Sequence, residues 1–309
     1  MSITTKGIVY GFGVQSVFGT PVAASSGLRV NKSGGLPDFV PNAALVEAKQ
    51  YDGRWGDSDY SEVAGIERPG CTLPLQARPG LLDILLEQVM SSATVTDTTY
   101  TLKSGTSCTP TADAYLTLFR RNSLASSKDK RLTDGVVKSI KLSSSESSQM
   151  VACEVEFLAS VLDVTNDASG GTFTRPTEAF WLHKGLTFSI AGTPTKCVEW
   201  DITFDFGTHG YIDNGTAIQE YLLGDLVITG NFKTPWADED ILTDFRTSVG
   251  NTLTWQWGSS GSAGYGLITV PAKYDATSED ENEKRLDNTV PFKLAESSGQ
   301  AFEVETNAA

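Results

Sequence analysis

The sequence predicts a mainly β protein with some α+β character. Three observations support this: 29 of the 309 residues are glycine, apolar and polar residues alternate in many short segments, and a strongly apolar helical stripe directly follows one of these segments. A high content of Gly, Ser and Thr is typical of chains with many turns and strands. The chain is also long enough for two domains of ordinary size, each with its own core.

Alternating patterns predict six strands in each half of the chain. In the first half they are residues 28–30, 44–51, 71–75, 115–119, 136–142 and 150–158. In the second half they are residues 186–190, 198–206, 226–232, 252–257, 267–270 and 290–295. Residues 1–27 lack a strong period and are predicted to form an N-terminal arm outside the core. Residues 166–180 have the Gly, Asn, Asp and Pro content of a linker.

One helix is predicted directly after the third strand of each half. Pro79 suits the first turn of the first helix, because an N–H at that position would lack an intrahelical partner anyway. Pro235 suits the same place in the second helix. The apolar residues of the two helices are Leu82, Leu85 and Val89 in the first and Ile241, Leu242 and Phe245 in the second. Each helix is expected to cover one face of a sheet.

The two halves also match each other element by element. The matched segments are 27–30 with 185–188, 44–56 with 198–210, 71–85 with 226–242, 114–121 with 251–258, and 135–159 with 266–295. Elements that recur in the same order at a spacing of roughly 130 to 160 residues predict a duplicated domain rather than a solenoid. The expected domains are residues 28–165 and 181–309.

The net charge of −14 is unevenly distributed. Residues 1–165 contain 17 acidic and 15 basic side chains, whereas residues 166–309 contain 21 and 9. Nucleic-acid binding requires clustered Lys and Arg to neutralise phosphates, so this balance argues against it. The sequence predicts a protein that repels DNA.

Nothing in the sequence predicts catalysis, a metal or a cofactor. The only two histidines, His183 and His209, stand near strand ends without the spacing of a metal site or a partnered nucleophile, so structural roles are expected for both. The four cysteines are widely spread and favour free thiols over a disulfide framework. No apolar run approaches the length of a membrane span.

A carbohydrate-binding or hydrolytic β-sandwich is the alternative from a different functional class. Trp255 and Trp257 share one face of a strand and could form a sugar platform, although core or interface packing is the favoured interpretation. Asp201 and Asp205 share a strand face as well, but two acids without a recognisable cleft are weak support for a glycosidase.

The combined pattern resembles a family, the tail tube proteins (major tail proteins) of bacteriophages with long, non-contractile tails. The stretches that carry the resemblance are "VFGTPVA" at 17–23, "YDGRWGDSDYSEVAG" at 51–65, "CTLPLQARPGLLDILLEQV" at 71–89, "DGVVKSIKLSSSESSQMVACEVEFLAS" at 134–160, "LVITGNFKTPWADED" at 226–240 and "LITVPAKYDATSEDENEKRLDNTVPFKLAESS" at 267–298. The resemblance implies two tandem tube domains of β-sandwich or half-barrel type, each with one flanking helix.

The resemblance also implies a function. Tail tube subunits form rings that stack into a hollow tube, which houses the tape-measure protein and conducts DNA into the host. Six tube domains usually complete a ring, so a chain with two would form a trimeric, pseudo-hexameric ring, and a hexameric ring is the alternative. Other expected partners are the tail terminator and distal tail proteins, and the expected location is the virion tail after synthesis in the host cytoplasm. A baseplate, fibre or head-decoration protein is the rival within virion architecture.

Two sets of residues follow from the resemblance as candidate sites. The expected ring-stacking residues are Arg54, Trp55, Asp57, Asp59 and Tyr60 in the first domain and Thr208, His209, Tyr211 and Asp213 in the second. The expected acidic hairpin contains Glu279, Asp280, Glu281 and Glu283. Such a hairpin is most often a solvated tip, and the sharper hypothesis is that it guards an electronegative surface.

Overall fold

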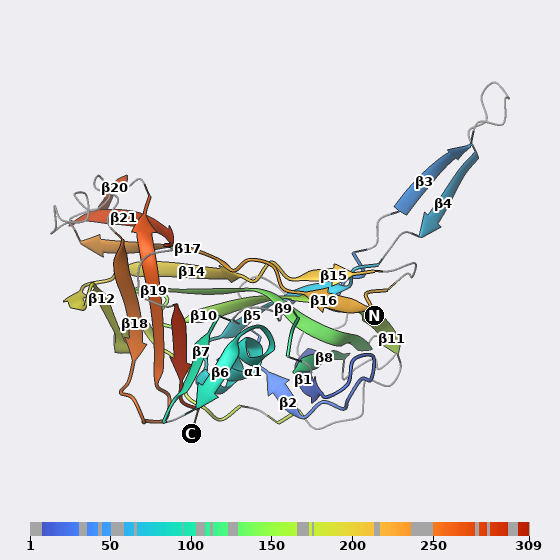
Figure 1. The fold of residues 1–309 in the computed structure, drawn as a ribbon, viewed down its shortest axis with the longest axis horizontal. Helices are drawn as coiled ribbons and strands as arrows, with labels where there is room; N and C mark the ends of the chain where they lie inside the picture. Colours follow the sequence, from blue (N-terminus) through green and yellow to red (C-terminus); the bar gives the residue numbers. More distant parts are fainter. Residues whose placement is uncertain are drawn as a thin grey trace.

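The chain is a mainly β protein built around one large antiparallel sheet (Figure 1). The computed structural model describes residues 8–30, 36–42, 45–50, 59–64, 67–94, 96–102, 109–111, 114–122, 129–165, 173–174, 176–212, 217–235, 250–275, 278–282, 285–295 and 302–308. Two further sheets have two strands each, and the described residues contain one α-helix.

Every strand predicted from the sequence overlaps an observed one. The first half contains β1 (Ile8–Gln15), β2 (Ser26–Leu28), β3 (Leu45–Gln50), β4 (Asp59–Ala64), β5 (Gly70–Gln76), α1 (Pro79–Val89), β6 (Ser91–Thr94), β7 (Thr98–Thr101), β8 (Tyr115–Asn122), β9 (Asp129–Ser145), β10 (Ala152–Leu158) and β11 (Val161–Thr165). The second half contains a short 3-10 helix (His183–Gly185), β12 (Leu186–Ile190), β13 (Thr193–Thr195), β14 (Glu199–Asp205), β15 (His209–Tyr211), β16 (Glu220–Leu222), β17 (Val227–Pro235), β18 (Asn251–Trp257), β19 (Gly266–Tyr274), β20 (Ser278–Asn282), β21 (Arg285–Leu294) and β22 (Glu303–Thr306).

The long strand β9 organises the first half. One edge of β9 pairs with β10 and then β11, and the other edge pairs with β8 near its start and with β14 near its end. Strands β1 and β5 extend the sheet by pairing with β8 and β10. The first half therefore has the strand order β1–β8–β9–β10–β5.

The second half joins this sheet at two places. Its own strands follow the order β12–β18–β19–β21–β17, and β14 pairs with both β17 and β9. The last strand, β22, pairs with β19 on one side and with β7 on the other. Most buried apolar residues of both halves also belong to one contiguous cluster. Within the described residues the two halves therefore share one sheet and one core.

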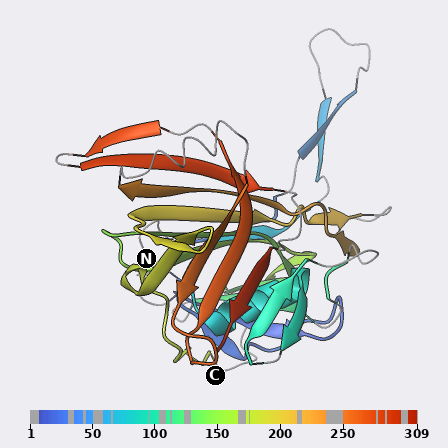
Figure 2. The same ribbon diagram turned by 60° about the vertical axis from the view of Figure 1, so that its left-hand side comes forward.

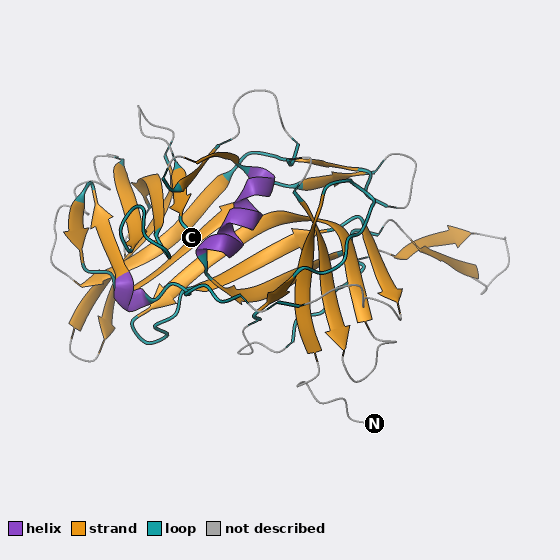
Figure 3. Cartoon of the chain, turned by 90° about the horizontal axis from the view of Figure 1, so that it is seen from below, coloured by secondary structure: helices purple, strands orange, loops and turns teal. Residues whose placement is uncertain are grey.

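Helix α1 lies against one face of the sheet, as predicted (Figure 3). Leu82, Leu85 and Val89 are buried, and the helix contacts β9, β7 and β22. The polar Gln88 is also fully buried, where its Oε1 accepts a hydrogen bond from the Val137 N–H at 3.1 Å. These residues pack within their own chain. The helix predicted after Pro235, with Ile241, Leu242 and Phe245, lies outside the described residues.

The segment predicted as a linker is attached to the first half where the structure describes it. The Thr174 carbonyl accepts a hydrogen bond from the Gly27 N–H at 2.7 Å, and the Glu178 carboxylate accepts one from the Gly80 N–H at 3.0 Å. The second bond satisfies a backbone donor in the first turn of α1, where intrahelical partners are missing. The described part of this segment is therefore packed structure.

The sequence predicted no core element before residue 28, and this was wrong for residues 8–15. They form β1, in which Tyr10 and Phe12 are buried. The pattern was obscured because Gly11 and Gly13 occupy buried positions where apolar residues were expected. A Cβ at Gly11 would lie 2.2 Å from the Phe173 ring, so only glycine fits this approach.

One buried polar contact connects α1 to the end of the chain. Asp83 of α1 accepts hydrogen bonds from the hydroxyl groups of Tyr100 in β7 (3.0 Å) and Thr306 in β22. Burial raises the pKa of Asp83 above its ordinary value, and the hydrogen bonds from Thr306 and Tyr100 offset part of that effect. The contact holds the helix and two distant strands together at the cost of desolvating a carboxylate.

We predict that Asp83→Asn keeps or raises the free energy of unfolding at pH 7, because the amide oxygen accepts both hydrogen bonds without a charge. Asp83→Ala should lose about 1–3 kcal/mol, because it leaves the buried Tyr100 hydroxyl without this acceptor. Urea unfolding of both variants measures the difference.

The pH dependence provides a second test of the same group. A raised pKa in the folded state contributes stability that is full below the unfolded-state pKa of about 3.9 and is lost as pH rises through the folded-state value. The advantage of Asp83→Asn over the wild type should therefore grow from pH 4 to pH 7. An advantage that shrinks over this range would contradict the assignment.

Candidate functional site

The β3–β4 hairpin is the most distinctive surface feature of the molecule. Its two strands pair antiparallel from Leu45 opposite Ala64 to Gln50 opposite Asp59, and they form a sheet of their own. The hairpin projects from the body in both Figure 1 and Figure 2. The sequence predicted a long polar loop or an extended hairpin here, and the extended hairpin is confirmed. An isolated hairpin is only marginally stable in water, so this arrangement requires support.

The first part of that support is a clamp at the hairpin base. Val40 and Gly70 form an antiparallel bridge, and the Arg68 N–H donates to the Pro41 carbonyl at 3.1 Å. The Asn42 side-chain amide donates to the Arg68 carbonyl, also at 3.1 Å. The two strands of the hairpin are therefore paired where they leave the body.

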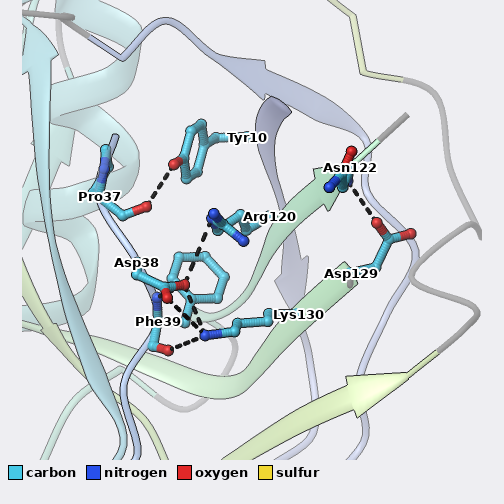
Figure 4. A network of polar contacts seen from close by, with 8 residues as sticks. All are labelled: Tyr10, Pro37, Asp38, Phe39, Arg120, Asn122, Asp129 and Lys130. Atoms are coloured by element: carbon cyan, nitrogen blue, oxygen red, sulfur yellow. Dashed lines mark hydrogen bonds and ion pairs between the residues drawn. The ribbon is translucent and has the colours of Figure 1, made fainter. Parts of the chain in front are cut away.

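The second part is a polar and aromatic anchor on the sheet (Figure 4). Lys130 Nζ donates to both carboxylate oxygens of Asp38 at 2.8 Å and to the Phe39 carbonyl at 3.0 Å. Arg120 Nε lies 3.6 Å from Asp38 Oδ1. The Phe39 ring is fully buried and meets Tyr10 edge to face, with ring centroids 6.4 Å apart.

Burial dominates the energetics of this anchor. Asp38 is about half exposed, so its ion pairs contribute at most about 1 kcal/mol each and mainly set orientation. Because Tyr10 is buried, desolvation raises the pKa of its phenol despite the neighbouring Arg120. The Tyr10 hydroxyl donates to the Pro37 carbonyl at 2.6 Å and fixes the segment that leads into the hairpin.

Two of the five predicted stacking residues of the first half fall on this hairpin. Asp59 and Tyr60 begin β4, where the structure describes the backbone alone. Arg54, Trp55 and Asp57 lie outside the described residues. Their role stays a prediction.

The predicted stacking residues of the second half fall on a smaller hairpin, β15–β16. His209 is opposite Leu222 and Tyr211 is opposite Glu220, and all four residues are exposed on one face of this ladder. The exposed fraction is 53% for Tyr211 and 41% for Leu222, so the face presents apolar surface. Thr208 differs from the prediction, because it is buried and its hydroxyl donates to the Val137 carbonyl at 2.8 Å. Asp213 lies outside the described residues.

The sheet face opposite α1 is polar across its central strands. Residues on this face alternate with buried ones along β10, β9, β14 and β17; they include Glu154, Glu156, Lys141, Ser143, Asp201, Thr203, Asp205, Thr229 and Asn231. The register places Lys141 between Glu154 and Thr203, and Asp201 accepts a hydrogen bond from the Asn231 side chain at 3.1 Å. On these four strands the face carries the acidic groups of Glu154, Glu156, Glu199, Asp201 and Asp205 and the basic groups of Lys138, Lys141 and Lys233. Lys138 Nζ lies 2.8 Å from Glu156 Oε1. The face is therefore a hydrogen-bonding surface of mixed charge with a small acidic excess. The sequence had indicated an acidic excess in the second half but not the composition of this face.

The predicted acidic hairpin is confirmed as a hairpin by its backbone. Glu279, Asp280 and Glu281 lie in β20, which pairs with β21. Glu283 lies outside the described residues.

Trp255 and Trp257 do not form the aromatic platform that a sugar-binding module would need, and the described residues contain no exposed tryptophan pair. Trp255 is completely buried and Trp257 nearly so, and Trp257 stacks on Trp181 with ring centroids 4.4 Å apart. Both tryptophans belong to the core, as the favoured interpretation predicted.

The groups most able to do chemistry have structural roles where they are described. His183 bridges the two halves: Nδ1 lies 3.1 Å from the Ser144 hydroxyl and Nε2 lies 3.1 Å from the Cys197 carbonyl. Burial raises the pKa of Cys153 and of Cys197 to about 12, so these thiols stay protonated at neutral pH.

No cluster of His, Cys, Asp or Glu suited to a metal ion lies among the described residues. None of the helices in that part of the chain is long and apolar enough to cross a membrane.

Comparison with protein-family models and with curated proteins found no match for this chain.

The anchor leads to a direct prediction. Phe39→Ala should lower the free energy of unfolding by about 3–5 kcal/mol, because it removes a fully buried ring from beneath the hairpin base. Urea unfolding followed by Trp fluorescence measures this change.

Val40→Ala is the matched control, because this neighbouring side chain is 40% exposed. It should change stability by no more than about 0.5 kcal/mol, as is usual for surface positions. Equal losses for the two variants would show that Phe39 does not anchor the segment.

Proposed function

We propose that this protein is a structural subunit of a bacteriophage tail tube and that it assembles into stacked rings around a hollow channel. The observation that carries the proposal is the β3–β4 hairpin, which leaves the body from a firmly anchored base. A two-stranded ribbon gains stability by packing or pairing, so its placement is best explained by contact with another copy of the chain. This agrees with the stacking role that the tail tube resemblance implies for the same segment.

The polar sheet face supports a channel wall. A surface of carboxylates, hydroxyls and amides, whose lysines are interspersed with a larger number of acidic groups, offers no cluster of basic side chains that could neutralise the phosphate backbone and retain DNA. Such a wall lets DNA pass without specific binding and leaves room for a tape-measure protein. No enzymatic activity and no cofactor belong to this proposal.

The two strand orders support a duplicated tube unit. The order β1–β8–β9–β10–β5 in the first half corresponds to β12–β18–β19–β21–β17 in the second. In this proposal the chain contains two tandem half-barrel units fused through β9 and β14. Three chains then complete a pseudo-hexameric ring, and the tail terminator and distal tail proteins bind the two ends of the tube in the virion.

Electron microscopy of concentrated, negatively stained protein tests the proposal. Hollow tubes with a regular ring repeat are the expected result. A persistent monomer under these conditions, and in the presence of tail-tip extract, would overturn it. Solid fibres or isolated plates would favour the rival fibre, baseplate or decoration roles.

The double substitution of Arg54 and Trp55 to Ala should leave the subunit folded but raise the concentration needed for polymerisation. The expected increase is at least about 30-fold, since truncating one hot-spot residue costs about 2 kcal/mol or more. Sedimentation of polymer across a concentration series measures it. Lys184→Ala with Lys196→Ala, which removes two exposed side chains of the second half, is the control and should polymerise normally.

Cysteine labelling tests the channel wall. A maleimide attached to a large polymer should label Thr203→Cys in dispersed subunits but not in tubes, because the channel excludes the polymer. Glu87→Cys, on the exposed side of α1, should react in both states. Labelling of Thr203→Cys in intact tubes would show that the polar face is not the channel wall.

A further inference from the structure

The second half contains a counterpart of the whole β9 strand. Strand β19 pairs with β21 from Ala272 opposite Leu294, and β20 continues the pairing from Ser278 opposite Thr289. Strands β19 and β20 therefore form one long ladder with β21, as β9 does with β10 and β11. β9 has 17 residues, whereas β19 has 9 and β20 has 5.

The edges of these two long strands are used differently. The start of β9 pairs with β8, and the end of the same edge, from Ser139 to Ser145, pairs with β14. The start of β19 pairs with β18 in the corresponding way. In the described part of the chain, however, no strand pairs with the edge of β20 that faces away from β21.

The opposite end of the sheet has a matching gap. Strand β17 pairs with β21 on one edge and with β14 on the other, whereas its counterpart β5 pairs with β10 alone. On the outer edge of β5 the described structure has only the bridge from Gly70 to Val40. Val40 therefore lies beside the first residue of β5, on the edge that corresponds to the β14 side of β17.

Both ends have the properties of a contact between copies. Val40 is 40% exposed at the β5 end. The exposed Arg29 lines a cavity of about 330 Å³ beside β5, while β20 contains three acidic residues in succession. β20 lies at the opposite end of the molecule from the hairpin that continues Leu36–Asn42 (Figure 1). Two different, complementary ends are what a head-to-tail ring requires.

Proline does not exclude pairing at the β5 end. Pro37 and Pro41 remove two backbone donors from the segment, and Pro74 removes one from β5. The same sheet already accepts Pro291 in β21, where Asn231 of β17 is its partner on one side and the Asp275 N–H donates to its carbonyl on the other.

We infer that copies of the chain join edge to edge, with β20 of one copy paired against Leu36–Asn42 and β5 of the next. This contact repeats between chains the β9–β14–β17 arrangement found within the chain. It rests on the proposed tube function for its closure into rings, and it identifies which edges a second copy uses.

Engineered disulfides test the pairing. Val40→Cys is combined in one chain with a cysteine at Ser278, Asp280 or Asn282, three alternate positions that cover small errors in register. Facing residues of paired strands have Cα atoms about 4.5–5.5 Å apart, within the range that a disulfide bridges. After assembly and oxidation with oxidised glutathione, at least one variant should give covalent oligomers that stop at a closed trimer on denaturing gels.

The control replaces the β20 cysteine with Thr289→Cys, on the interior strand β21, and should give no covalent oligomer with Val40→Cys. The outcomes separate the two proposals. Tubes without disulfides in all three variants would overturn the edge assignment and leave the tube function intact. Disulfide-linked oligomers without tubes would support the edge contact and refute the tube function, and the absence of both would refute both.

Discussion

The backbone ladder of β9 is the constraint on which the rest of the structure depends. β9 pairs on both edges, and it is the strand through which the second half joins the first by way of β14. Its inward side chains, including Leu132, Val136 and Ile140, are completely buried. A shift of β9 by one residue would turn these side chains to the polar face and move every strand paired with it. The helix, the hairpin anchor and the polar face therefore take their positions from a single register.

The same register separates the polar face from the anchor of the hairpin. Alternation along the strands places the core on the side of α1 and the carboxylates and amides on the other side. Lys130 and Arg120, near the start of β9 and on β8, hold the segment that leads into the hairpin. The polar face and the projecting hairpin thus take their positions from different parts of the same sheet.

The sequence predicted the elements better than their arrangement. Period-2 alternation identified the main strands, and the stripe of Leu82, Leu85 and Val89 identified α1, because local patterns record which side chains are buried. β1 was missed because Gly11 and Gly13 replace apolar side chains at crowded positions. The pairing of β14 with β9, and of β22 with β7, could not be predicted, since antiparallel partners far apart in the sequence leave no local signal.

The candidate site shows the same limit. The hairpin was predicted from one long polar stretch between two strand patterns. Its anchor at Asp38 and Phe39 was not, because it depends on Tyr10, Arg120 and Lys130, which lie far from it in the sequence. The exposed face of β15–β16 was partly predicted through His209 and Tyr211, but Thr208 proved to be buried because the hairpin turns its side chain toward β9.

The position of β22 determines the stage of synthesis at which the fold can be completed. This strand contains nearly the last residues of the chain, yet it lies between β7 of the first half and β19 of the second, and Thr306 donates to Asp83. Residues 303–306 must therefore leave the ribosome before β7 and β19 acquire their common partner. Contacts between such distant residues form slowly, because the intervening loop must close first. A partly synthesised chain that ends before β22 thus lacks the finished fold.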